Sequence, residues 1–195
     1  MNQLLFDEDK HQYQLDGMII PSVTQILHDS GLVNLDWVDK ELLEEKSDLG
    51  KKVHSATELY DTNELDIDRL HQTLKLYLAG WTEFRENYGF VPTEIELQLS
   101  HPLYKYAGRI DRIGFIGKDL TLLDIKSGTK QKVHGIQTAG YKLLYDCGKK
   151  KTAQIKRRLI VYLSETGYKV EENRNPQDMN VFLAALIITN YKRGL

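Results

Sequence analysis

The stretch that most restricts the possible folds of this chain is GRIDRIGFIGKDLTLLDIK, residues 108–126. Two apolar runs flank Gly117-Lys118, and glycine in the first position of a two-residue turn suits the twist of antiparallel strands. The sequence therefore predicts a β-hairpin, and the two-residue turn fixes which residues face each other. The opposed pairs that follow are Ile116–Asp119, Phe115–Leu120, Ile113–Leu122 and Asp111–Asp124.

Three charged side chains share one face of this hairpin. Because side chains alternate along a strand, Asp111, Asp124 and Lys126 lie together at the end away from the turn. Opposed carboxylates lie about 5 Å apart, and at an effective dielectric constant of roughly 20 their repulsion is about 3 kcal/mol. A fold keeps such an arrangement only where a shared proton, a neighbouring base or a cation offsets the repulsion.

Two interpretations of this charged face are open. In the first, Lys126 and Arg109 neutralise the two acids as an ordinary ion cluster. In the second, Asp111 and Asp124 hold a divalent cation, and Lys126 lies beside a water that attacks a phosphate. Hard carboxylate oxygens suit Mg²⁺ or Mn²⁺.

A further acid would help to complete a metal site. The preceding strand, predicted over residues 94–99, offers Glu94 and Glu96 on one face. A solvent-facing strand edge is the other interpretation of these two residues. On the residues alone, the choice between Glu94 and Glu96 stays open.

The charge of the chain is unevenly distributed. The net charge is −2, but residues 1–100 carry 20 acidic and 8 basic side chains, whereas residues 101–195 carry 8 acidic and 18 basic ones. The basic half contains the clusters Lys149-Lys150-Lys151 and Lys156-Arg157-Arg158. Such a basic half suits binding to a phosphate backbone, and a solvated face is the simpler alternative interpretation.

Composition excludes several classes of protein. With 195 residues, 41% of them apolar and 28% charged, the chain is expected to form one globular domain over residues 1–195. It has no apolar run long enough for a transmembrane helix and no secretory signal, so no membrane partner and a cytoplasmic location are expected. The single Cys147 excludes an internal disulfide and a four-cysteine metal site.

The expected order of elements predicts a mixed α/β (α+β) fold with a central mixed β-sheet flanked by helices. An N-terminal unit over residues 1–34 contains a hairpin and a short helix that begins at Ser22. The remaining expected elements are helices at 35–59, broken near Gly50, and at 67–88, strands at 94–99, 108–116 and 120–126, a helix at 133–146, strands at 158–163 and 168–171, and a helix at 178–191.

Asp111, followed at a hairpin's distance by Asp124-Ile125-Lys126, resembles the motif of the PD-(D/E)XK nuclease superfamily. The neighbouring YAGRIDRI and LLDIKSGTK are similar to the RecB-like exonuclease branch, which includes exonucleases of phage type. Three further segments match this branch in the same order: GKKVHSATE, IELQLSHPLYKYAGRID and GIQTAGYKLLY. The resemblance covers most of the chain from about residue 50, and the N-terminal GMIIPSVTQIL is similar to phage-encoded members.

The resemblance implies a restriction-endonuclease-like core over about residues 50–195 and a metal site within it. Its matching positions imply that His54, Asp111, Asp124 and the carbonyl of Ile125 ligate the metal, with Glu96 as the additional acid. A helix histidine that faces solvent is the alternative interpretation of His54.

The same resemblance implies roles for three more side chains. Lys126 would orient or help to deprotonate the attacking water, or stabilise the pentavalent phosphate. Gln137 and Tyr141, four residues apart on one helix face, would brace the site or touch the DNA backbone, although a surface glutamine and a packed tyrosine would look the same.

Two departures from the family pattern are visible. Ile110 precedes Asp111 where the superfamily's name has a proline. Some relatives hold an iron–sulfur cluster through four cysteines, and a chain with one cysteine is expected to hold none.

The expected function is a Mg²⁺- or Mn²⁺-dependent DNA exonuclease that acts in phage-type recombination or DNA end processing. The expected partners are DNA and either a recombination protein or further copies of this chain. Two alternatives are a catalytically silent module that binds DNA or protein, and an endonuclease or RNase of the same superfamily. The basic C-terminal half suits all of these functions.

Overall fold

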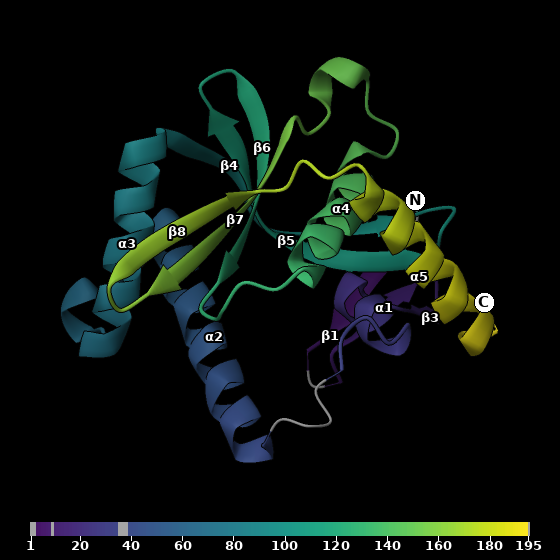
Figure 1. The fold of residues 1–195 in the computed structure, drawn as a ribbon, viewed down its shortest axis with the longest axis horizontal. Helices are drawn as coiled ribbons and strands as arrows, with labels where there is room; N and C mark the ends of the chain where they lie inside the picture. Colours follow the sequence, from purple (N-terminus) through teal and green to yellow (C-terminus); the bar gives the residue numbers. More distant parts are fainter. Residues whose placement is uncertain (1–2, 9, 35–38, 195) are drawn as a thin grey trace.

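The computed structural model describes residues 3–8, 10–34 and 39–194, which form a mixed α/β fold with two β-sheets (Figure 1). A three-stranded sheet contains β1 (Leu4–Asp7), β2 (Gln12–Leu15) and β3 (Met18–Ile20). A five-stranded sheet contains β4 (Phe90–His101), β5 (Tyr106–Ile116), β6 (Asp119–Lys126), β7 (Arg157–Ser164) and β8 (Gly167–Glu172). The helices are α1 (Val23–Asp29), α2 (Lys40–Asp61), α3 (Gln72–Tyr88), α4 (Val133–Asp146) and α5 (Gln177–Arg193), with short 3₁₀ turns at Ile67–Arg69 and Lys151–Ala153.

The large sheet is mixed, as predicted. Its order is β4-β5-β6-β7-β8, and β6 pairs with β7 in parallel while the other neighbours are antiparallel. The hairpin has the predicted register in the pairs Ile116–Asp119, Phe115–Leu120 and Ile113–Leu122.

The last predicted pair of the hairpin, Asp111–Asp124, is not present in the ladder. The ladder between β5 and β6 ends at Arg112 and Leu123, so Asp111 and Asp124 are not ladder partners. Instead, the backbone N–H of Ile125 donates to Asp111 Oδ2 over 2.7 Å, while β6 continues beside β7 as far as Lys126. A carboxylate therefore accepts a hydrogen bond that a strand carbonyl would otherwise take.

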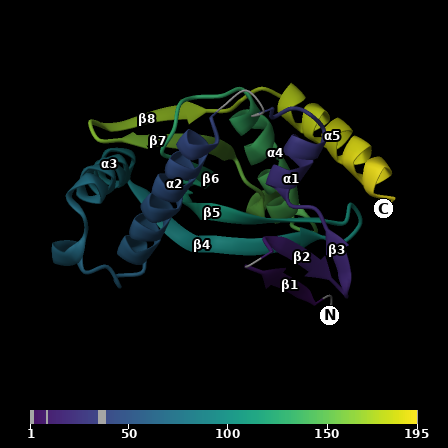
Figure 2. The same cartoon turned by 90° about the horizontal axis from the view of Figure 1, so that it is seen from below.

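Helices cover both faces of the large sheet (Figure 2). On one face, the core joins α2 and α3 to the strands through Val53, Trp81, Leu123 and Val161. On the other face, α1, α4 and α5 pack through Val23, Tyr141 and Phe182 against Ile113 and Leu122. The hairpin strands are thus buried on both sides.

The predicted N-terminal hairpin is present as β1 and β2, and a third strand, β3, extends it to a three-stranded sheet. Asp16 and Gly17 have φ of 51° and 83°, which is the conformation of a tight hairpin turn, and they join β2 to β3. The sheet packs on β5 through Ala107, whose N–H donates to the carbonyl of Pro21 over 2.9 Å. The expected cap at Ser22 is confirmed as a capping box with Gln25.

Two helix predictions need correction. The break expected near Gly50 is absent, because α2 runs without interruption through that residue. Gly50 lies beside Ser127 in the loop after β6, where a Cβ atom would make only ordinary van der Waals contact. The helix expected over 67–88 is divided by Leu70 and His71, and His71 caps the start of α3. The part of the expected helix at residues 35–38 lies outside the described residues.

Within the described residues, no helix is both long and apolar enough to cross a lipid bilayer.

Candidate active site

Helix α2 places His54 beside the C-terminal end of β6, the central strand of the large sheet. The Nε2 atom of His54 lies 2.9 Å from the carbonyl oxygen of Ile125, and a carbonyl only accepts hydrogen bonds, so Nε2 is the protonated nitrogen. In the neutral ring, Nδ1 is then free to act as a ligand. This atom lies 3.7 Å from Asp111 Oδ2 and 4.0 Å from Glu96 Oε1.

These three side chains can hold a metal ion together. One ligand atom from each of His54, Glu96 and Asp111 lies within 4.8 Å of the others. One imidazole nitrogen and two carboxylate oxygens form a donor set that suits divalent cations such as Mg²⁺, Mn²⁺ or Zn²⁺.

Asp124 adds a buried acid to the same cavity. Its side chain is 1% exposed, and Oδ2 lies 2.8 Å from Lys126 Nζ. Neither carboxylate oxygen has a hydrogen bond of normal geometry. A buried carboxylate in this condition is costly unless a cation or a further donor satisfies it. The residues present therefore fit a divalent metal.

Glu96, and not Glu94, lies in the cavity. Glu94 is exposed, whereas Glu96 lines the cavity and lies between two guanidinium groups, 3.1 Å from Arg109 Nε and 3.0 Å from Arg112 Nη1. Glu96 also has a left-handed backbone with φ of 50°, a conformation that costs an L-residue about 1–2 kcal/mol. A strained backbone conformation persists only where many surrounding contacts hold it in place, and such residues are common at functional sites.

Charge interactions shift the pKa values of the site. Burial lowers the pKa of His54, but the charges of Asp111 and Glu96 outweigh burial and raise it. Burial raises the pKa of Glu96, yet His54, Arg112 and Arg109 together lower it below its ordinary value.

The pKa values of Asp124 and Lys126 are both raised. Burial raises the pKa of Asp124 against the attraction of Lys126. Burial lowers the pKa of Lys126, but Asp124 and Asp111 raise it by more. A charged ammonium beside buried acids is therefore the favoured state of Lys126.

Helix α4 contributes the last two predicted residues. Gln137 Nε2 donates to the hydroxyl of Tyr141 over 3.1 Å, and both side chains line the cavity. The cavity has a volume of about 470 Å³. All seven residues predicted from the sequence as site side chains line it, together with the backbone of Ile125: His54, Glu96, Asp111, Asp124, Lys126, Gln137 and Tyr141.

A comparison with protein families decides the identity of this fold. The model of the PD-(D/E)XK nuclease superfamily matches residues 25–187. The chain belongs to this superfamily. The match contains every site residue named above, so these residues lie in the part of this nuclease that the family shares.

Solved structures give more distant likenesses, and 24 chains match. A putative exonuclease from Eubacterium rectale is 13% identical over 74% of this chain and 68% of that one, with a TM-score of 0.48. LHK-Exo, an alkaline exonuclease from Laribacter hongkongensis, is 14% identical in its complex with dAMP, over 90% and 92% of the two chains, with a TM-score of 0.34. SSO0001 is 18% identical with a TM-score of 0.38, and the match spans 60% of this nuclease and 58% of that chain, less than two thirds of its length. No curated protein matches significantly.

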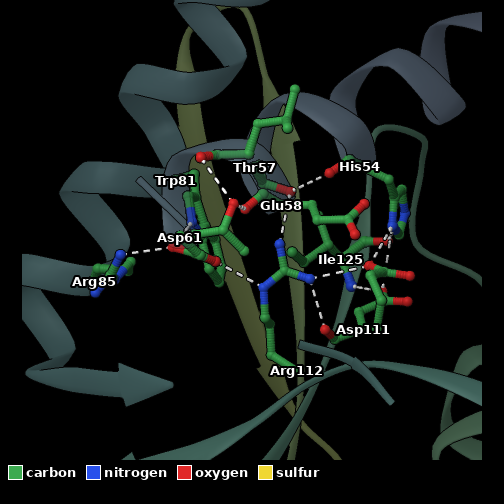
Figure 3. A network of polar contacts seen from close by, with 12 residues as sticks. His54, Thr57, Glu58, Asp61, Trp81, Arg85, Asp111, Arg112 and Ile125 are labelled. Atoms are coloured by element: carbon green, nitrogen blue, oxygen red, sulfur yellow. Dashed lines mark hydrogen bonds and ion pairs between the residues drawn. The ribbon is translucent and has the colours of Figure 1, made fainter. Parts of the chain in front are cut away.

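A buried arginine network supports the cavity of the nuclease, and the sequence analysis missed it (Figure 3). Arg112 is fully buried on β5. Its Nη1 donates to Glu96 Oε1 over 3.0 Å and to the carbonyl of Asp111 over 2.6 Å, and its Nε donates to Asp61 Oδ2 over 2.7 Å. Its Nη2 donates to Thr57 Oγ1 over 3.3 Å. The guanidinium therefore joins β4, β5 and α2.

Asp61 is the second centre of this network. Its other oxygen, Oδ1, accepts hydrogen bonds from Trp81 Nε1 over 3.1 Å and from Arg85 Nη1 over 2.6 Å, both on α3. One signal of the network was available in the sequence: Arg112 is a charged residue in an apolar strand, and such a residue rarely lies buried without a partner. No spacing in the sequence indicates which residues of α2 and α3 contact Arg112.

The two arginines that contact Asp61 give a stability prediction. We expect Arg112→Leu to lower the free energy of unfolding by about 3–5 kcal/mol, because it leaves a buried carboxylate without its main partner. Arg85 contacts the same carboxylate but is 27% exposed, so Arg85→Leu should cost about 1 kcal/mol. Urea unfolding monitored by circular dichroism measures both values. Equal losses in the two variants would contradict the central role of Arg112.

His134 on α4 predicts a loss of stability in weak acid. Burial, and after it the Lys126 ammonium, lower the pKa of His134 to about 4. Because this value lies below the unfolded value of about 6.5, the unfolded chain binds the proton more tightly. The contribution to stability is complete above pH 6.5 and is lost as the pH falls toward 4.

We expect His134 to account for at most about 2 kcal/mol of lost unfolding free energy at pH 5, less any solvent screening. Urea unfolding of the wild type and of His134→Asn at pH 7.5 and pH 5 isolates this contribution. The asparagine variant should show the smaller pH dependence, and identical slopes in the two proteins would refute the assignment.

Proposed function

We propose that this nuclease is a metal-dependent exonuclease that hydrolyses phosphodiester bonds in DNA. The observation that carries the proposal is the buried Asp124 carboxylate, which lacks a hydrogen bond of normal geometry and shares a cavity with a His-Glu-Asp cluster. The Lys126 ammonium faces Oδ2 of Asp124, and a divalent cation is the simplest additional group that would satisfy Oδ1 and the neighbouring acids.

The proposed metal ligands are the Nδ1 atom of His54 and the carboxylates of Glu96, Asp111 and Asp124. When bound, a divalent cation polarises a scissile phosphate and lowers the pKa of a water molecule. The carbonyl of Ile125 already accepts from His54, and its second lone pair leaves it available as a further ligand.

The chain's own side chains would orient the substrate. Lys126 Nζ, 2.8 Å from Asp124, can donate to the attacking water or to a phosphate oxygen and so stabilise the charge that develops there. The Tyr141 hydroxyl has accepted a hydrogen bond from Gln137, which leaves its proton free for a phosphate oxygen. Both donors come from rigid elements, a strand and a helix, which favours precise placement.

The substrate proposal rests on chemistry and on family resemblance. The basic C-terminal half supports a polyanionic substrate. The similarity of YAGRIDRI and LLDIKSGTK to RecB-like and phage-type exonucleases supports DNA, Mg²⁺ or Mn²⁺, and a role in recombination or end processing. A partner recombination protein or a homo-oligomer and a cytoplasmic location belong to the same proposal.

The first experiment compares two forms of DNA. End-labelled linear DNA and closed circular DNA of equal length are incubated with the protein in Mg²⁺, Mn²⁺ or EDTA. We expect metal-dependent loss of the linear DNA alone. Cutting of the circle would indicate an endonuclease, cleavage of RNA alone would indicate an RNase, and tight DNA binding without cleavage in any metal would indicate a silent binding module.

The second experiment tests the site residues. We expect Asp124→Asn and Lys126→Met each to lower the cleavage rate by about 10²–10³-fold, because each removes a charge that acts on the reacting phosphate. Glu96→Gln should lower both the rate and the affinity for Mn²⁺, measured by calorimetry. Glu94→Gln is the matched control and should keep the wild-type rate. A comparable loss in Glu94→Gln would reverse the assignment of the additional acid.

A further inference from the structure

The N-terminal sheet lies beside β5 (Figure 2), and some of its side chains line the cavity that contains the proposed catalytic residues. Phe6 on β1, His11 before β2 and Tyr13 on β2 line this cavity together with Asp111 and Lys126. All three rings precede residue 25, where the match to the superfamily begins. The family resemblance therefore gives them no role.

The three rings form one aromatic cluster. The centroids of Phe6 and Tyr13 are 4.5 Å apart with ring planes 35° apart, and His11 meets Phe6 edge to face at 5.3 Å. Tyr13 is buried and packs with Ala107 of β5, which anchors the cluster on the large sheet. His11 is exposed and Phe6 is half-buried, so both rings keep surface that a ligand can contact.

Two hydrogen bonds order the backbone of His11, the residue that carries the exposed ring of this cluster. His11 has a left-handed conformation with φ of 50°, and its carbonyl accepts a hydrogen bond of 3.4 Å from Gln25 Nε2 on α1. Its N–H donates to the carbonyl of Glu8 over 3.3 Å. Because two hydrogen bonds already order the backbone of His11, ligand binding at this residue costs little additional backbone entropy.

The cavity thus combines two kinds of surface. One part carries cations and carboxylates suited to a phosphate and a metal, and the other carries flat aromatic rings. Arg109, 44% exposed, lines the same cavity and lies near Tyr13, where its charge lowers the pKa that burial raises. A ligand that is anionic at one end and flat and aromatic at the other matches both surfaces, and a nucleotide unit has this chemistry.

We propose that Phe6 and His11, supported from below by the buried ring of Tyr13, form a stacking subsite for the base of an unpaired nucleotide next to the scissile phosphate. This inference rests on the proposed nuclease function and adds the substrate class. A base inside a duplex is stacked on its neighbours and offers no free face unless it is unstacked at a cost of a few kcal/mol. The subsite therefore selects single-stranded or frayed DNA ends over blunt duplex ends.

A cycle that combines protein variants with a modified substrate tests the stacking contact. Fluorescence anisotropy in EDTA measures binding of a single-stranded oligonucleotide and of the same oligonucleotide with abasic residues at its terminal positions. We expect Phe6→Ala and His11→Ala to weaken binding of the intact oligonucleotide about tenfold, within the range for loss of one stacked base. Neither variant should weaken binding of the abasic oligonucleotide further.

Two control variants, and the choice of His11→Ala as a second test variant, separate stacking from damage to the sheet. Leu5→Ala changes an exposed neighbour on β1 that does not line the cavity, so it should bind like the wild type. Phe6→Tyr keeps a ring and should restore affinity. His11→Ala removes an exposed side chain and leaves the core intact, so it tests the proposal even if Phe6→Ala fails to fold.

The outcomes distinguish this proposal from the proposed function. If the variants weaken binding of both oligonucleotides equally, or of neither, the stacking subsite is refuted, while metal-dependent cleavage by the wild type still supports the nuclease. If the wild type neither binds nor cleaves DNA with any metal, both proposals fail. In Mg²⁺, stacking also predicts a higher KM for His11→Ala with an unchanged kcat.

Discussion

The ion pair between Arg112 and Asp61 connects the parts of the molecule that form the cavity. Both side chains are fully buried, and such a pair is favourable only when its remaining hydrogen-bonding capacity is used. Arg112 also donates to Glu96, to Thr57 and to the carbonyl of Asp111, and Asp61 also accepts from Trp81 and Arg85. Because Thr57 and Asp61 lie on the helix that carries His54, this network fixes the imidazole relative to the two acids.

The sequence predicted the hairpin because two simple constraints agree there. A two-residue turn sets the register, and the period of two places Asp111, Asp124 and Lys126 in one cavity. His54, Gln137 and Tyr141 came from the resemblance alone, since helical periodicity does not say which helix lies beside which strand end. The structure brings these residues together.

Other features were beyond sequence reasoning for identifiable physical reasons. The left-handed backbone at Glu96 breaks the strand pattern, and nothing in a glutamate indicates a positive φ. Gly50 suggested a helix break, but α2 runs through it, because one glycine costs a helix of this length only about 1 kcal/mol. The contribution of Phe6, His11 and Tyr13 to the cavity depends on how a separate small sheet docks on β5, which is a long-range contact.

The turn of the β5–β6 hairpin lies at the opposite end of the strands from Asp111 and Asp124. Gly117 and Lys118 form the tip, and Ile116 lies five positions after Asp111, which corresponds to about 17 Å along the strand. No residue of the tip lines the cavity. The protein can therefore be engineered at this turn: a short inserted peptide, a dye or an attachment point for a solid support would leave the chemistry at the other end of the strands unchanged.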